Sequence, residues 1–333
     1  MDVRLPLEAR GCQSAAAWGE GAEVAVRPHS RAAKGRRYAL RLRRRVFLLW
    51  LAAALPGTGA FGLAAEEPAK PLFAFAVVSD THLGKGGEGP AKGMRQIVEE
   101  INASNAELTL FLGDLVDTGA KNEPLYAEWL TLAKGLRKPY YVVPGNHDPV
   151  ESFKKHIHPE TDYVVDVKGF RFVLFNDSEP GLHDGVVTPE QVKWLGQQID
   201  DAAAKRLRVF LCAHVAAHPN KHPDVGWWVR KGERELEALL VAKGGNPIVA
   251  FLSGHFHCGL RGWSDRGGVH EIVVPSALWN GDRKLETAPG FSAKESRKGY
   301  VLAEVYAREL QLRYKPLGAP AGSALVLGES GSK

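Results

Sequence analysis

Seven side chains that can bind metal ions directly follow predicted β-strands, in five separate parts of the chain. They are Asp80, His82, Asp114, Asn146, His214, His255 and His257. Three offer a side-chain oxygen and four offer an imidazole nitrogen, a donor set that suits zinc, iron and manganese. Seven ligands can hold two divalent or trivalent ions and leave coordination positions for water. This donor set favours metal-assisted hydrolysis of a phosphate ester.

The segments before these ligands have the composition of buried strands. They are the apolar runs 72–79, 108–112, 140–143, 208–213 and 248–253. Helices are predicted between the strands, over residues 94–103, 125–136, 188–204 and 232–243. The first has apolar residues at helical spacing, and the third begins with Thr188 and Pro189, which suit its first two positions. Strands that alternate with helices predict an α/β fold, in which strand ends converge on one crevice.

The remaining predicted strands form a hairpin and part of a second sheet. The hairpin covers residues 163–167 and 170–176, and the second sheet takes residues 268–274, 300–306 and 310–314. We see no repeat or linker that divides residues 70–316, so these residues are predicted to form one catalytic domain. Residues 317–333 are rich in Gly, Ala and Ser and are expected to be a flexible tail.

The charge of the chain is unevenly distributed. Residues 1–65 carry 11 Lys and Arg against 4 Asp and Glu, a net charge of +7, whereas the other residues carry 32 against 34, a net charge of −2. The body of the protein therefore shows no strong nucleic-acid signature, because binding to nucleic acids requires a basic surface. We expect the substrate to be a small phosphate ester.

The N-terminal residues have the order of an export signal. Basic Arg43-Arg44-Arg45 precedes a short apolar stretch, which ends in small residues at 62–65. The stretch contains Pro56 and several Gly and is short for a membrane span. Residues 1–65 are therefore interpreted as a basic extension plus an export signal, of a type that resembles twin-arginine signals. We expect an exported protein, periplasmic or extracellular, that contacts a membrane only through this signal, with an uncleaved anchor as the alternative.

The five groups of ligands together resemble the calcineurin-like metallophosphoesterase superfamily. The motifs are Asp80-Thr81-His82, Gly113-Asp114 with Asp117, Gly145-Asn146-His147-Asp148, His214, and Gly254-His255-Phe256-His257, in this order. The resemblance implies a four-layer α/β/β/α sandwich with a dinuclear metal centre at the strand ends. A weaker similarity to class III cyclic-nucleotide phosphodiesterases rests on residues 139–143 and 188–195.

The resemblance also implies a role for each residue of the motifs. Asp80, His82 and His257 would bind the first metal ion, Asp114 would bridge both ions, and Asn146, His214 and His255 would complete the second site. A hydroxide between the ions would be the nucleophile, as in a phosphodiesterase or a phosphomonoesterase. His147 would protonate the leaving alkoxide, and Asp148 would orient His147. Purple acid phosphatases have an iron-binding tyrosine where this chain has Asp117, so the resemblance implies that the protein would not be purple. Asp117 would instead fix a neighbouring ligand or the backbone.

Some alternatives stay open at this point. The enzyme could be a nuclease of the same fold, or the chain could be a catalytically silent metal-binding scaffold. His218 is the alternative to His214, and Arg261 could bind a phosphate of the substrate. The tryptophans at 227, 228 and 263 could contact an aromatic substrate or pack within a loop, and His183 is expected in a solvated loop. Cys212 and Cys258 are expected to be buried thiols, with a disulfide as the alternative.

Overall fold

The computed structural model of the protein describes residues 70–117, 123–217, 227–262, 268–281, 291–292 and 297–328. The extension and export signal predicted over residues 1–65 lie outside these ranges. Residues from Ala65 onward form one compact unit, which contains all the elements described below. No helix in the described ranges combines the length and the apolar character that crossing a membrane requires.

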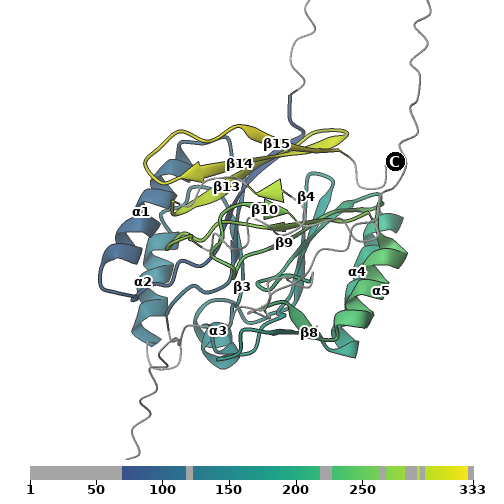
Figure 1. Ribbon diagram of the computed structural model, residues 1–333, viewed down its shortest axis with the longest axis horizontal. Helices are drawn as coiled ribbons and strands as arrows, with labels where there is room; N and C mark the ends of the chain where they lie inside the picture. Colours follow the sequence, from purple (N-terminus) through teal and green to yellow (C-terminus); the bar gives the residue numbers. More distant parts are fainter. Residues whose placement is uncertain are drawn as a thin grey trace, which may run out of the picture. The chain divides into compact units, whose positions relative to one another are not determined.

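The first sheet has six strands in the order β15-β14-β13-β1-β2-β3 (Figure 1). Their bounds are β1 Phe73–Val78, β2 Thr109–Leu112, β3 Tyr140–Val143, β13 Gly299–Val305, β14 Glu309–Pro316 and β15 Ala324–Gly328. Strands β1, β2 and β3 run parallel, whereas β13, β14 and β15 extend the sheet from β1 in antiparallel order. The carboxyl ends of the three parallel strands therefore meet at one edge.

The second sheet has seven strands in the order β12-β10-β11-β9-β7-β5-β4. Their bounds are β4 Tyr163–Val167, β5 Phe170–Leu174, β7 Arg208–Cys212, β9 Ile248–Ser253, β10 Arg261–Gly262, β11 His270–Val273 and β12 Phe291–Ser292. Strands β5, β7, β9 and β11 are parallel, and β4 and β5 form the predicted hairpin. A separate two-stranded sheet pairs β6 (Gly185–Val186) with β8 (Val229–Lys231).

Helices cover the outer face of each sheet, which gives the predicted four-layer sandwich. The helices are α1 Gly89–Asn102, α2 Glu123–Ala133, α3 Val150–His156, α4 Pro189–Ala204 and α5 Glu233–Lys243. Figure 1 shows α1 and α2 on one side of the two sheets and α4 and α5 on the other. Three apolar cores separate the layers. Between the sheets, the ring of Phe75 lies 5.2 Å from that of Phe210 and 5.4 Å from that of Phe172, so aromatic packing helps to hold the sheets together.

The start of α4 follows the predicted pattern. The side chain of Thr188 accepts a hydrogen bond from the backbone N–H of Gln191, and the Gln191 side chain accepts one from Thr188. This capping box satisfies two N–H groups that the helix leaves without partners. The expected buried thiols are confirmed as well, because Cys212 and Cys258 are both free and buried.

Two features of the fold differ from the prediction. Strands β13 and β14 were expected in the second sheet, but they pair with β1 in the first. Alternation of apolar residues shows that a strand has one buried face, but it does not identify the neighbouring strand. The flexible tail predicted from residue 317 is also wrong over Ala324–Gly328, because this segment forms β15 and pairs with β14.

Candidate metal centre

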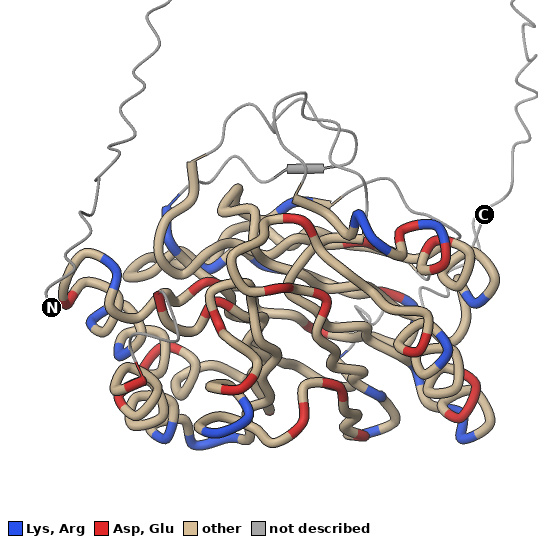
Figure 2. The backbone as a smooth tube through the Cα atoms, turned by 90° about the horizontal axis from the view of Figure 1, so that it is seen from below, with Lys and Arg blue, Asp and Glu red and all other residues tan. Residues whose placement is uncertain are grey.

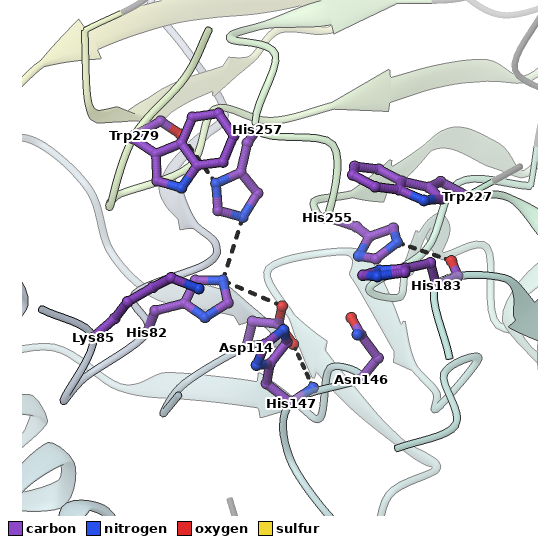
Figure 3. Close-up of a pocket in the computed structure, with 10 residues that line it drawn as sticks. All are labelled: His82, Lys85, Asp114, Asn146, His147, His183, Trp227, His255, His257 and Trp279. Carbon is purple, nitrogen blue, oxygen red and sulfur yellow. Dashed lines mark hydrogen bonds and ion pairs between the residues drawn. The ribbon is translucent and has the colours of Figure 1, made fainter. Parts of the chain in front are cut away.

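The strand ends of the two sheets bring all seven predicted ligands into one place. In the first sheet, Asp80 and His82 follow β1, Asp114 follows β2, and Asn146 follows β3. In the second sheet, His214 follows β7, and both His255 and His257 follow β9. Figure 3 shows the side chains of these loops that point toward a common cleft. The crevice predicted from the strand pattern is therefore present.

The first cluster consists of Asp80, His82 and His257. The Nε2 atom of His257 lies 3.2 Å from Asp80 Oδ1 and 3.3 Å from His82 Nε2. The Nε2 atom of His82 lies 3.9 Å from Asp80 Oδ1. All three residues are buried, and one potential ligand atom from each lies within 4.8 Å of the others. This spacing allows the three atoms to surround one ion.

The second cluster consists of Asp114, His214 and His255, and its Asp114 carboxylate also lies beside His82 of the first cluster. Asp114 Oδ1 lies 3.4 Å from His214 Nε2, while Oδ2 of the same carboxylate lies 3.3 Å from His82 Nε2. The two oxygens of Asp114 therefore face different clusters. Asn146 lines the same cleft, and its Oδ1 atom is buried without a hydrogen-bond partner. The position of Asp114 would allow the bridging role that the family resemblance implies, and that role stays a prediction.

Three of the four imidazoles lie within hydrogen-bonding distance of a backbone carbonyl, and the fourth, His82, lies near the Asp117 carboxylate. The Nδ1 atoms of His214 and His257 lie 2.7 Å and 3.1 Å from the carbonyl oxygens of Leu112 and Trp279. The Nε2 atom of His255 lies 2.9 Å from the carbonyl oxygen of His183, and His82 Nδ1 lies 3.5 Å from Asp117 Oδ1. Where a ring N–H donates a hydrogen bond to a carbonyl oxygen, the opposite ring nitrogen is the one that can bind a metal ion. Metal-binding histidines are oriented in this way.

The electrostatics of the two clusters suit cations. Burial raises the pKa of the Asp80 carboxyl, but the His257 and His214 imidazoles together outweigh this effect and hold the pKa well below its usual range. Burial likewise raises the pKa of the Asp114 carboxyl, but the neighbouring imidazoles, His214 above all, outweigh burial. The pKa of Asp114 therefore also lies well below its usual range. Burial lowers the pKa of His82 to about 4 and that of His255 to about 3, so both rings are neutral at pH 7. Ionised carboxylates and neutral imidazoles are the forms that bind metal ions.

Buried atoms without partners also fit bound metal ions. Asp80 Oδ1, Asn146 Oδ1 and His214 Nε2 are buried and have no hydrogen-bond partner. Burial lowers the pKa of His214, but the Asp114 carboxylate outweighs it and raises the pKa to about 10. Without an ion, a proton on His214 therefore balances the Asp114 charge. A metal ion can take the place of that proton and satisfy all three atoms.

The backbone at the ligands is strained. Eight described residues other than glycine have a positive φ, and five of them are predicted ligands: Asp80 (56°), His82 (40°), Asp114 (51°), His255 (72°) and His257 (49°). This left-handed conformation is rare for residues with a Cβ atom and costs on the order of 1–3 kcal/mol each. The rest of the fold offsets this cost, and strain of this kind concentrates at functional sites.

The glycines of two motifs are required by close approach. A Cβ atom on Gly145 would collide with the backbone N and the Oδ1 atom of Asp114. A Cβ atom on Gly254 would collide with the side chain of Ser79 and would lie 2.8 Å from Asp80 Oδ2. The ligands of neighbouring strands can pack this closely only because these two positions lack a side chain.

His147 lies beside both clusters, and Asp117 orients it. The Nδ1 atom of His147 lies 3.4 Å from Asp117 Oδ1, which also lies 3.3 Å from Lys85 Nζ. The ring of His147 meets that of His82 edge to face, with centroids 4.7 Å apart. With Nδ1 directed to Asp117, Nε2 is the nitrogen that can exchange a proton with a substrate. The expectation that Asp117 fixes neighbouring groups fits these contacts.

The predicted contact between Asp148 and His147 is wrong. Asp148 Oδ2 accepts hydrogen bonds from the backbone N–H groups of Leu115 and Gly145, at 3.0 Å and 2.9 Å. Its Oδ1 accepts one from Tyr126 Oη at 3.2 Å. Asp148 is buried, and its hydrogen bonds link the loop after β2 to the loop after β3. Adjacency in the sequence suggested the contact with His147, but the turn directs the two side chains differently.

A small cleft gives access to the two clusters. Its volume is about 130 Å³, and it is lined by His82, Lys85, Asp114, Asn146, His147, His183, Trp227, His255, His257 and Trp279 (Figure 3). Three of these residues, Lys85, His183 and Trp279, were not identified as site residues from the sequence. The backbone carbonyl of His183 contacts His255, and that of Trp279 contacts His257. No sequence motif identifies such backbone contacts or the exposed ring of Trp279.

Other residues considered from the sequence lie elsewhere. Arg261 is buried in β10 and Trp228 stacks against Arg230, at 4.8 Å from the guanidinium carbon to the ring centre. Neither lines the cleft. His218 and Trp263 lie outside the described residues.

Comparisons with known proteins agree with this geometry. The sequence model of one family, described as calcineurin-like phosphoesterase, matches residues 73–259. A probable cyclic nucleotide phosphodiesterase of Rhodococcus erythropolis is 27% identical over 273 residues, which cover 77% of this chain and 87% of the relative. A cAMP/cGMP dual specificity phosphodiesterase of Mycobacterium tuberculosis is 27% identical over 278 residues, covering 77% and 82%. A dimetal phosphatase from Danio rerio shares the fold, with a TM-score of 0.61 at 16% identity, covering 78% of this chain and 100% of that one.

Proposed function

The chain belongs to the calcineurin-like phosphoesterase family, and from this premise we propose that it hydrolyses small phosphodiesters. It is a metal-dependent phosphoester hydrolase that uses two metal ions. The observation that carries the proposal is the position of Asp114, which lies between two ligand clusters with His147 beside them. Members that serve only as scaffolds have no need of such a metal-free imidazole at the cleft.

The ligand residues divide into two sets. Asp80, His82, Asp114 and His257 would hold one ion, and Asp114, Asn146, His214 and His255 would hold the other. When bound, the two ions supply positive charge that neutralises the phosphoryl oxygens and lowers the pKa of water in the site. The protein contributes the rigid placement of the ligands, which the left-handed turns and the carbonyl partners of the imidazoles maintain.

His147 supplies the proton for the leaving group. The ring lines the cleft, and a quarter of its side chain is exposed, so it can reach a substrate. Asp117 Oδ1 lies 3.4 Å from Nδ1 and thereby orients the ring so that Nε2 is left for the substrate. A protonated Nε2 can then donate to the alkoxide oxygen as the P–O bond breaks. The benefit is largest for a poor leaving group, which cannot depart as a stable anion.

The charge of the cleft favours diesters over monoesters. A monoester carries a second ionised oxygen at neutral pH, which needs an additional cation or donor. Among the described lining residues, Lys85 is the only lysine or arginine, and its ammonium group lies 3.3 Å from Asp117. The two curated relatives reported above are both phosphodiesterases by name, which supports the same choice.

A long polyanion is a poorer fit than a small ester. Residues outside the N-terminal 65 carry a net charge of −2, and Figure 2 shows acidic and basic positions interspersed along the backbone. A nuclease would use a continuous basic track to hold several phosphates. The small volume of the cleft agrees with a single phosphate group.

The test compares two chromogenic esters with the purified protein loaded with Mn²⁺. Bis(p-nitrophenyl) phosphate should be hydrolysed with a higher kcat/KM than p-nitrophenyl phosphate. His147→Ala should lower kcat about 10²–10⁴-fold with both metal ions retained, and His158→Ala, outside the cleft, should change it little. Absence of turnover with metal bound would instead support the scaffold alternative, and preference for the monoester would contradict the choice of diester.

We also propose that the protein is exported through its N-terminal segment. The basic residues at 43–45, the apolar stretch and the small residues at 62–65 support this proposal. The test is fractionation of cells that express the full chain, with Arg44→Lys/Arg45→Lys as the variant. Retention of the wild-type protein in the cytoplasm would contradict export, and export of the variant would contradict a twin-arginine signal.

A further inference from the structure

Trp279 stands out among the large apolar residues of the described structure. The residue is 52% exposed, yet it lies in a segment whose backbone is tightly held. The other exposed large apolar residues, such as Val241 at 57%, do not line the cleft. An exposed indole at the entrance to a catalytic cleft leaves much apolar surface in water, which a ligand could cover.

The segment that carries Trp279 is rigid. Ser276 accepts hydrogen bonds on its Oγ atom from the backbone N–H groups of Leu278 and Trp279, at 3.0 Å and 3.3 Å. The side chain of Asn280 accepts from the N–H of Ser276 at 2.8 Å and donates to its carbonyl at 2.9 Å. Ser276 and Asn280 are both buried. The indole is therefore presented on a fixed turn, so little ordering is required when a ligand binds.

The position of Trp279 is fixed relative to the metal centre. Its carbonyl oxygen lies 3.1 Å from Nδ1 of His257, and its ring lies 4.7 Å from the His257 ring with an interplanar angle of 42°. Figure 3 shows the indole beside His257, across the cleft from Trp227. The contact between the Trp279 carbonyl and His257 involves only the backbone, so it does not depend on the indole. The rest of the indole lines the cleft and is open to solvent.

Trp227 does not offer an equivalent surface. Its ring stacks on that of His183, with centroids 4.9 Å apart and an angle of 27°, and it also lies 5.4 Å from His255. These contacts cover much of the ring, so Trp227 forms part of the cleft wall and has less free surface than Trp279. Among the described residues, the Trp279 ring contacts the aromatic ring of His257, and about half of the residue is accessible to solvent.

We propose that Trp279 is a specificity residue, which stacks on a flat ring in the alcohol part of the substrate. This inference rests on the proposed phosphodiesterase function. The cleft of about 130 Å³ is small beside pockets of roughly 300–1,000 Å³ that enclose a whole ligand. The phosphate therefore enters, and the organic part remains at the entrance, where Trp279 lies. Stacking is tolerant of ring type, so nucleobases as a class are the ligands that fit.

The test measures the binding of two ligands, of which one carries a nucleobase and the other does not. Calorimetry on the full chain loaded with Mn²⁺ would compare adenosine monophosphate with ribose 5-phosphate. The wild-type protein should bind the adenosine compound more tightly. Trp279→Ala should weaken that binding about 5- to 100-fold, while the affinity for ribose 5-phosphate changes less than twofold. Trp279→Phe should recover most of the loss, and Val241→Ala, an equally exposed site away from the cleft, should have no effect.

Several results would overturn the inference. One is equal affinity of the wild-type protein for the two ligands, and another is an equal loss for both ligands in Trp279→Ala, which would indicate a structural role. Failure of both ligands to bind would also contradict it. Failure of the proposed function has a different signature: ring-dependent binding would persist, but bis(p-nitrophenyl) phosphate would not be hydrolysed.

Discussion

Substitution of Asp148 by alanine tests whether this carboxylate supports the two ligand loops, as the structure shows, or acts in the chemistry. In the structure it accepts hydrogen bonds from Leu115, Gly145 and Tyr126 at 3.0, 2.9 and 3.2 Å. Alanine at this position leaves these three buried donors without an acceptor. An unsatisfied buried group costs about 1–3 kcal/mol, so with three such donors the variant should lose about 3–9 kcal/mol of unfolding free energy. This loss is a large part of the roughly 5–15 kcal/mol that stabilises a typical domain.

The free energy of unfolding is measured by urea titration of the metal-free proteins, followed by circular dichroism. Asp148→Asn is the companion variant, because it keeps one acceptor oxygen and should lose about half as much stability. It also keeps the measurement informative if Asp148→Ala fails to fold. Asp117→Ala is the control, because its partly exposed side chain makes longer contacts and its removal should cost less than about 1 kcal/mol.

The reasoning about Asp148 is refuted if Asp148→Ala unfolds within about 1 kcal/mol of the wild-type protein. It is also refuted if both Asp148 variants keep full stability and metal content but lose turnover. That second result would restore the catalytic role that the sequence suggested for this residue.

Three further predictions follow from the contacts of the site. Asp117→Ala should lower kcat about 10- to 100-fold with both metal ions retained, as measured by steady-state kinetics and elemental analysis; unchanged kcat would show that Asp117 does not position His147. Gly145→Ala should cost about 1–3 kcal/mol in urea titration because its Cβ would displace Asp114, whereas Gly89→Ala, with open space around it, should be nearly neutral. Asp114→Ala should reduce metal content at both positions, while Asn146→Ala should reduce it by at most one ion per chain; full content in Asp114→Ala would contradict the shared carboxylate.

Sequence patterns were sufficient for the location of the ligands. Apolar runs that end in Asp, Asn or His mark strands whose carboxyl ends converge, because parallel strands share an edge. The structure brings Asp80 of the first sheet and His257 of the second to within 3.2 Å, although 177 residues separate them in the chain. The five ordered motifs predicted that these residues would lie close together. Which residue binds which metal ion stays a prediction.

Other features depend on contacts that no local pattern encodes. The carbonyl oxygen of His183, which holds His255, belongs to the backbone and could come from any residue type. The partners of Asp148 are fixed by a turn whose side-chain directions the motif does not specify. Strand β15 carries weak amphipathic character in a Gly- and Ala-rich stretch, so only its pairing with β14 identifies it. Trp279 is exposed because of tertiary structure, which composition does not reveal.

Anomalous diffraction from crystals loaded with Mn²⁺ tests the central claim most directly. We predict two peaks in each chain, roughly 3.5–4 Å apart, with the carboxylate of Asp114 in contact with both. A single peak in each chain, or two peaks too far apart for one carboxylate to reach, would contradict a dinuclear centre.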